Sequence, residues 1–190
     1  MKYSTVMWEE LQRDVETLAR SVSASGEQFD LMVVIARGGM TIGHILSDFT
    51  GIPVAALTIT TFTGTERARS ARVSYGIEAD LGGKRVLLVD DVSDSGATFA
   101  AAADYLRSHG VAVVKTAALY TKPWTAHVPD FSVRQFDNWI IYPYEVRETI
   151  ESLHGIWSKD GVAADEMKRR LIELGIAEEY IERYMPHSGA

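Results

Sequence analysis

The amino-acid sequence predicts an α/β domain built on a mostly parallel β-sheet flanked by helices, with a small cap and a helical C-terminal tail. Two unbroken apolar runs, at residues 31–36 and 85–90, are typical of strands that are buried on both faces of a parallel sheet. Helical segments alternate with such runs along the chain. An alternation of strands and helices favours parallel β-α-β units.

The elements can be justified in order along the chain. From Trp8 onward, apolar residues recur every three or four positions with charged residues between them, which predicts an amphipathic helix that begins near Thr5 and ends at Gly26. Strand, helix, strand, strand, helix and strand are then expected at residues 31–36, 40–49, 53–60, 85–90, 98–109 and 111–120. The polar stretch at 61–75 is expected to be a mobile loop.

A cap and a tail are expected beyond the sheet. Residues 131–142, bordered by Pro129 and Pro143, predict one or two short strands in a cap. The tail carries apolar residues at helical spacing on both sides of Gly175, which predicts two short helices. We expect a main domain at 1–154, with cap elements at about 121–145, and a helical tail at 155–190.

The composition excludes several classes of function. A net charge of −7 and a pI near 5.2 argue against a surface that coats nucleic acid. The absence of cysteine rules out disulfides, thiolate nucleophiles and zinc ribbons, and it suits a reducing cytoplasm. Neither a signal peptide nor a membrane span is recognisable. We therefore expect a cytoplasmic protein with no nucleic-acid or membrane partner.

The window VLLVDDVSDSGAT places two adjacent carboxylates where a buried strand ends. Ligands of open α/β sheets lie at such strand ends, and the N-terminus of the next helix offers free N–H groups to a phosphate. Gly96 permits close backbone approach, while Ser95 and Thr98 add hydroxyl donors. Asp90 and Asp91 would repel a phosphate, but they can accept bonds from a sugar diol or hold Mg²⁺-bound water. A ribose 5-phosphate has both parts.

This window resembles the phosphoribosyl-pyrophosphate (PRPP) signature of the type I phosphoribosyltransferases, in which two acidic residues precede Asp-Ser/Thr-Gly-x-Thr. The resemblance implies a phosphoribosyltransferase-type fold over about residues 28–150. It also implies that Asp90 and Asp91 hold the ribose hydroxyls and Mg²⁺, the metal through water. The 5-phosphate would be bound by Asp94, Ser95, Gly96, Ala97 and Thr98. Ala97 replaces a lysine or glycine often found in the family, with little expected loss, because that position acts through its backbone N–H.

A second segment, Ile35-Ala-Arg-Gly-Gly39, is similar to the family's pyrophosphate loop. By this resemblance the pyrophosphate would be bound by Ala36, Arg37, Gly38 and Gly39. Arg37 can fork onto phosphate oxygens, and the glycines let backbone N–H groups turn inward. The family often has a cis peptide just before the basic residue, here between Ala36 and Arg37. An ordinary strand-to-helix turn is the alternative interpretation.

A third match concerns the acceptor base. Lys122-Pro123 and the segment DNWIIYPYE resemble the purine-binding elements of 6-oxopurine phosphoribosyltransferases, closest to the xanthine-guanine and hypoxanthine type. The resemblance implies that Lys122 donates to the purine O6, Trp139 stacks on the ring and Ile140 offers its backbone to the 2-position. A core tryptophan is the alternative for Trp139. Glu145, in place of the usual aspartate, would touch the 2-substituent, bind a second Mg²⁺ or cap the helix that follows.

Two further features are left open by the sequence. The predicted loop at 61–75 occupies the position of the family's closing loop without its Ser-Tyr pair, and Thr61-Phe62 is the nearest equivalent. The arginines of this stretch either neutralise pyrophosphate on closure or form a solvated basic loop; they are Arg67, Arg69 and Arg72. His127 is close in sequence to the proposed base pocket, and we expect a surface role for it.

The sequence thus predicts a Mg²⁺-dependent purine phosphoribosyltransferase. A 6-oxopurine would displace pyrophosphate from C1 of PRPP, which gives a nucleoside 5-monophosphate. Asp94 is the candidate catalytic residue, as a general base or a hydrogen-bond acceptor at the purine N7. The expected partners are PRPP, a purine base and further copies of the chain, as a homodimer or homotetramer.

Two other functions compete with this prediction. A PRPP- or nucleotide-sensing regulator on the same fold is the alternative from another class, and the net charge of −7 counts against it. Adenine or orotate as the acceptor is disfavoured by Lys122, because an ammonium is a poor partner for an exocyclic amine. The choice among xanthine, guanine and hypoxanthine stays open.

Overall fold

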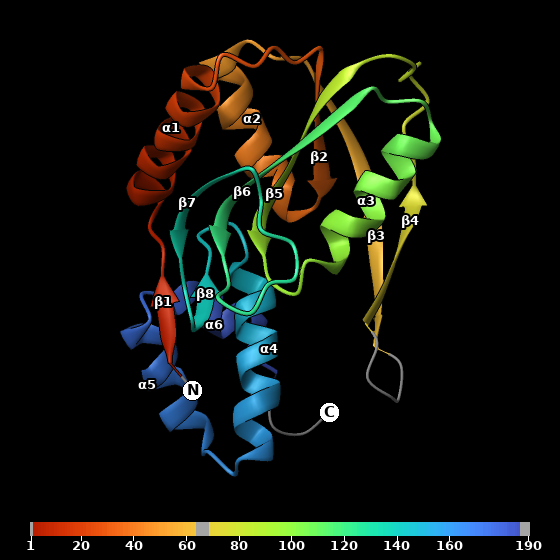
Figure 1. The fold of residues 1–190 in the computed structure, drawn as a ribbon. Coiled ribbons are helices and arrows are strands. Elements are labelled where there is room, and N and C mark those ends of the chain that lie inside the picture. Colours follow the sequence, from red (N-terminus) through yellow and green to blue (C-terminus); the bar gives the residue numbers. More distant parts are fainter. Residues whose placement is uncertain (1, 64–68, 187–190) are drawn as a thin grey trace. The chain divides into compact units, whose positions relative to one another are not determined.

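The computed structural model describes residues 2–63 and 69–186. Contacts divide the chain into two compact units, Leu11–Asp137 and the combination of Met1–Glu10 with Asn138–Ala190. The elements, labelled in Figure 1, are β1 (Tyr3–Thr5), α1 (Trp8–Ala24), β2 (Leu31–Ala36), α2 (Gly38–Thr50), β3 (Val54–Thr63), β4 (Arg69–Tyr75), β5 (Arg85–Ser93), α3 (Ala97–Ser108), β6 (Val113–Thr121), β7 (Phe131–Gln135), β8 (Trp139–Ile141), α4 (Val146–Lys159), α5 (Ala164–Glu173) and α6 (Glu178–Tyr184).

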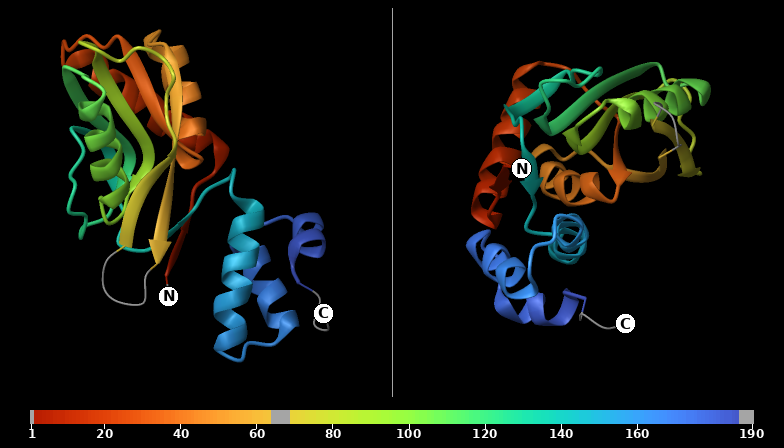
Figure 2. Two further views of the ribbon diagram at one scale, coloured as in Figure 1. Left: turned by 90° about the vertical axis from the view of Figure 1, so that its right-hand side faces the viewer. Right: turned by 90° about the horizontal axis from the view of Figure 1, so that it is seen from below.

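The larger unit is a six-stranded sheet in the order β4-β3-β2-β5-β6-β7. Every neighbouring pair is parallel except β3 and β4. Helices α2 and α3 lie on opposite faces of this sheet (Figure 2). The predicted fold class, a mostly parallel sheet flanked by helices, is therefore confirmed.

The apolar runs at the centre of the sheet are buried on both faces because each face has its own helix. Alternate residues of β2, β3 and β5 pack with α3 in one cluster that includes Val33, Ile35, Leu57, Val86, Leu88, Phe99, Ala102 and Leu106. On the other face, Gly43 of α2 lies so close to Val34 that a methyl group there would overlap the valine side chain. Each face of the central strands is therefore covered by a helix.

Asp14 of helix α1 contacts the two strands β6 and β7 at one edge of the sheet. The Tyr120 hydroxyl donates to the Asp14 carboxylate at 2.7 Å, and the guanidinium of Arg134 is paired with the same carboxylate. Burial, followed by the bond to Asp14, raises the pKa of Tyr120 above its ordinary value. These contacts connect α1 to β6 and β7.

The prediction of a mobile loop at 61–75 is wrong for most of that segment. Strand β3 continues to Thr63, and β4 begins at Arg69 and pairs with it antiparallel. The threonine-rich sequence of β3 suits an extended strand, and the cross-strand partner satisfies the backbone that a loop would leave to solvent. Residues 64–68 lie outside the described residues, so the predicted role of Arg67 is not tested. The same holds for the side chains of Thr61, Phe62 and Arg69.

The smaller unit combines a two-stranded parallel sheet with three helices. Strand β1, which the sequence did not predict, pairs with β8 in the register Tyr3 with Trp139. The two predicted tail helices are present as α5 and α6, and their apolar residues pack with those of α4. The segment predicted as a cap divides between the units, because β7 extends the main sheet and β8 joins β1.

The predicted boundary between residues 154 and 155 falls within α4, which is continuous from Val146 to Lys159. That division into a main domain and a tail stays a prediction. Among the described residues, none of the helices combines the length and the apolar character needed to cross a bilayer.

Candidate active site

The two motifs that the sequence placed at separate strand ends meet in the structure. The start of α2 lies directly against the end of β5. A Cβ atom on Gly39 would lie 2.6 Å from the carbonyl oxygen of Val89, and one on Gly38 would overlap the Asp91 carboxylate. Contacts this close are possible only without a side chain, so both glycines are required for the backbone to approach the acidic pair.

The acidic pair is buried and electrostatically unfavourable. Asp90 and Asp91 are 8% and 7% exposed. Burial raises the pKa of Asp90 well above its usual range, and the neighbouring charge of Asp91 raises it further. The backbone N–H of Asp91 donates to Asp90 Oδ1 at 3.0 Å, and a backbone bond from Gly39 also favours the charged form. Two carboxylates held this way are suited to a partner that brings hydroxyl donors or positive charge.

Arg37 stands between β2 and α2, next to the two glycines. Its peptide bond with Ala36 is cis, as the resemblance leads us to expect. The side chain of Arg37 is exposed, and its carbonyl accepts the backbone N–H of Met40 at 3.0 Å. The predicted pyrophosphate loop therefore lies at the same sheet edge as the acidic pair.

The predicted phosphate loop follows β5 and leads into α3. Gly96 has a φ of +85° immediately before the helix, a backbone conformation that favours glycine. A Cβ atom at this position would also lie 2.6 Å from the backbone nitrogen of His127. The backbone N–H of Ala97 is 3.4 Å from Ser95 Oγ. Ala97 and Thr98 open α3, where the first N–H groups have no acceptor within the helix and can bind an anion.

The connection between β6 and β7, residues 122–130, supports this loop, and sequence reasoning missed it. The backbone N–H of Lys122 donates to the Ser93 carbonyl at 3.0 Å, and that of Ala126 donates to the Ser95 carbonyl at 3.2 Å. The buried hydroxyl of Ser93 donates to the His127 carbonyl at 2.7 Å. These bonds join loops about thirty positions apart, so no local pattern marks them.

His127 has a packing role, and the expected surface role is wrong. Its ring stacks on Phe99 with centroids 5.0 Å apart and planes 10° from parallel. Burial lowers the pKa of the imidazole, which favours the neutral form. The residue fills the space that glycine leaves at position 96.

Lys122, predicted to contact the purine O6, and Asp94, predicted to contact N7, lie at the same end of the sheet. Lys122 is 7% exposed, and burial lowers the pKa of its ammonium, while the carboxylates of Asp94 and Asp137 raise it. Asp94 accepts a hydrogen bond of 2.8 Å from Trp124 Nε1. Trp124 was not among the predicted site residues, although it follows Lys122-Pro123 directly.

The remaining predicted residues belong to the smaller unit. Trp139 is 39% exposed on β8, so its interpretation as a core tryptophan is wrong. Ile140, its neighbour on the same strand, is buried. Glu145 precedes α4, but its side chain makes no capping hydrogen bond to that helix. Its two ligand-binding interpretations stay predictions.

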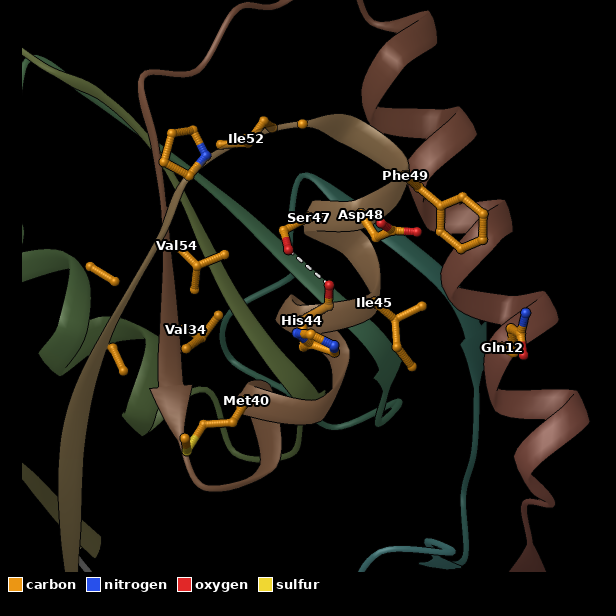
Figure 3. A pocket seen from close by; sticks show the side chains of 14 residues that line it. Gln12, Val34, Met40, His44, Ile45, Ser47, Asp48, Phe49, Ile52 and Val54 are labelled. Carbon is orange, nitrogen blue, oxygen red and sulfur yellow. Dashed lines mark hydrogen bonds between the residues drawn. The ribbon is translucent and has the colours of Figure 1, made fainter.

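A separate hollow of about 900 Å³ lies beside α2 and the first residues of β3 (Figure 3). Met40, His44, Phe49 and Val54 contribute to its lining, and the Ser47 hydroxyl donates to the His44 carbonyl at 2.8 Å. Among the described residues, those predicted for the candidate site do not line this hollow. The candidate site thus rests on the strand ends and not on this hollow.

Comparisons with known proteins agree with the motifs. Residues 7–149 match the family described as a phosphoribosyl transferase domain. Xanthine-guanine phosphoribosyltransferase of Gluconobacter oxydans is 30% identical over 147 residues, which cover 75% of this chain and 84% of that protein. Purine phosphoribosyltransferase of Pyrococcus horikoshii has a similar structure, with a TM-score of 0.68 and 31% identity over 76% of this chain and 95% of the other. Orotate phosphoribosyltransferase of Sulfurisphaera tokodaii is 28% identical over 131 residues, 66% of this chain and 59% of that protein.

Proposed function

The chain belongs to the phosphoribosyltransferase family of pentosyl-transferring enzymes, and on this premise we propose that it transfers the 5-phosphoribosyl group of PRPP to a 6-oxopurine. The products are pyrophosphate and a nucleoside 5-monophosphate. One observation carries the proposal: the glycines that open α2 pack against Asp90 and Asp91, so the residues predicted for pyrophosphate and those predicted for ribose lie at one sheet edge. Relatives named for purine and xanthine-guanine transfer support a purine acceptor.

PRPP would be bound by three parts of this edge. The N-terminus of α3 and the loop from Asp94 to Thr98 would bind the 5-phosphate through backbone N–H groups and hydroxyls. Asp90 and Asp91 would accept the ribose 2- and 3-hydroxyls. Arg37 and the backbone N–H groups of Gly38 and Gly39 would hold the pyrophosphate as it leaves.

The acidic pair also fits Mg²⁺. Carboxylate oxygens are the donors that this ion prefers. Burial and then the neighbouring charge of Asp91 raise the pKa of Asp90, and a cation would offset both effects. In the described part of the chain, no group of three or more acidic, histidine or cysteine side chains forms a complete metal cage. Such a pair suits an ion that takes its other ligands from water and substrate phosphates. When bound, Mg²⁺ would neutralise charge on the departing pyrophosphate.

The resemblance to 6-oxopurine phosphoribosyltransferases also assigns the residues that would hold the base. Lys122 would donate to the purine O6, Trp139 would stack on the ring and the backbone of Ile140 would meet the 2-position. Asp94 would accept the proton, or a hydrogen bond, from the purine N7 while the bond between the purine and C1 of the phosphoribosyl group forms. Holding two substrates in line supplies much of the rate, and preorganised donors at the pyrophosphate supply more.

The ribose assignment is tested by calorimetry of PRPP binding to Asp90→Asn/Asp91→Asn. A hydrogen bond to a charged group contributes ~1.5–3 kcal/mol, so the double variant should bind PRPP at least about 100-fold more weakly. Asp104→Asn, an exposed carboxylate on α3, is the matched control and should bind as the parent does. Unchanged PRPP affinity in a folded double variant would overturn the assignment.

A further inference from the structure

We propose that Trp124 is a positioning residue, which holds the carboxylate of Asp94 in the orientation that the purine N7 requires. The inference rests on the proposed function and adds to it a residue of the β6–β7 connection. Trp124 would act through Asp94 and would not itself touch the reacting atoms.

The contact that carries this inference is the hydrogen bond of 2.8 Å from the indole Nε1 to Asp94 Oδ1. A tryptophan N–H is a donor only, and an ionised carboxylate accepts at both oxygens. The bond therefore orients the carboxylate of Asp94 through one of its oxygens. Trp124 is 56% exposed, so its position is not explained by burial in the core.

Backbone hydrogen bonds between the neighbours of Trp124 and those of Asp94 hold the two residues close together. Lys122 and Ala126, two positions before and after Trp124, donate their N–H groups to the carbonyls of Ser93 and Ser95, which flank Asp94. The backbone N–H of Thr125 closes the turn by donating to the Lys122 carbonyl at 3.1 Å. The indole is thus presented to the carboxylate by a fixed frame, and its place does not depend on the Nε1 bond alone.

The same indole also lies against the other charged group of the proposed base site. The Lys122 Nζ is 5.8 Å from the centroid of the Trp124 ring, within the range of a cation–π contact. One side chain therefore touches both the proposed O6 donor and the proposed N7 acceptor. Its indole N–H and its ring face serve different partners, and substitutions can separate the two.

The experiment compares Trp124→Phe with Trp124→Leu in steady-state assays of pyrophosphate release. Phenylalanine keeps a ring near Lys122 but removes the N–H, so we expect kcat to fall roughly tenfold, equivalent to ~1.4 kcal/mol, with the KM for PRPP unchanged. Leucine removes the ring as well and should lower activity at least as much. Trp8→Phe, another exposed tryptophan, is the control and should behave as the parent.

A double-mutant cycle shows whether Trp124 acts through Asp94. In an Asp94→Ala background, Trp124→Phe should change single-turnover rates by less than about twofold, because the acceptor of its N–H is already gone. Full additivity would overturn the inference, as would a rise in the KM for the base alone, which would mean that the indole stacks on the purine. If the parent is active and Trp124→Phe has the same kinetic constants, only the inference about Trp124 is overturned. A parent that is inactive on every base would overturn the proposed function together with it.

Discussion

At Asp90, stability and the proposed function oppose each other. The carboxyl is buried beside Asp91, and both the burial and the neighbouring charge raise its pKa. A raised carboxyl pKa means that the folded protein binds more protons than the unfolded chain, so stability falls as the pH rises from the ordinary carboxyl range toward the raised value. The proposed ligand site therefore retains a buried acidic pair at a cost in stability.

Asp90→Asn should therefore raise thermal stability. The asparagine oxygen can still accept the backbone N–H bonds of Asp91 and Gly39, while the buried charge is lost. At about pH 8 we expect a higher melting temperature than the parent's, by ~2–4 °C for each kcal/mol gained. The difference should shrink as the pH approaches ~4, where the carboxyl takes up its proton even when unfolded. A melting temperature below the parent's at pH 8 would contradict this account of the pair.

The sequence predicted these carboxylates because all the residues of their motif lie in one short segment. Strand, acidic pair, glycine and helix start follow one another from Val86 to Thr98. The sequence did not predict Trp124 or the packing of His127, because both depend on bonds between loops that are distant in the chain. The exposed position of Trp139 also required the structure, since a tryptophan four positions before Pro143 is compatible with a core position as well.

Among the elements, the contact of α2 with the end of β5 matters most for the site. Gly39 is the second residue of α2, where an alanine would ordinarily favour the helix. Here the backbone of Val89 and Asp90 occupies the space that a methyl group would need. Glycine at position 39 is therefore required by the close approach to the acidic pair and is not explained by helix propensity.

Gly39→Ala and Gly155→Ala make a matched pair, because both place an alanine in a helix. At Gly155, within α4, a Cβ atom would meet nothing within 4 Å, so we expect a gain of ~0.5–1 kcal/mol in the free energy of unfolding. At Gly39 we expect a loss of ~1–3 kcal/mol from overpacking, together with weaker PRPP binding. Denaturant unfolding and calorimetry measure both quantities. If both variants were stabilised alike, the close contact with β5 would be refuted.

The antiparallel pair of β3 and β4 shows why the segment at 61–75 was wrongly predicted as a loop. Its arginines and polar residues were typical of a solvated loop, and the antiparallel partner that makes an extended strand favourable is not visible in a local pattern. The parallel strands were easier to predict. Their continuous apolar runs carry their own signal of burial on both faces.

For the whole molecule, the sheet order explains how residues from distant segments reach one edge. Because β2, β5 and β6 are adjacent and parallel, their carboxyl ends carry Arg37, Asp90 and Lys122 to the same edge. The exposed Trp139 lies on β8, within the smaller unit. Cytoplasmic location and assembly into a homodimer or homotetramer stay predictions of the sequence.

The choice of base tests the whole account. An ammonium has three donors and no acceptor, so Lys122 should favour a ring carbonyl over an exocyclic amine. We expect 6-oxopurines to be used at least ~100-fold better than adenine, which corresponds to ~2.7 kcal/mol in transition-state binding. Lys122→Met should narrow this ratio, mainly by lowering the rate with the oxopurine.

The most direct measurement follows pyrophosphate release from PRPP and Mg²⁺ with xanthine, guanine, hypoxanthine, adenine and orotate supplied one at a time. Product nucleotides are identified in the same samples, and a competition between hypoxanthine and adenine at equal concentration gives their ratio directly. The account predicts rapid release with at least one 6-oxopurine and its monophosphate as the product. Release mainly with adenine or orotate, or no release with any base, would contradict it.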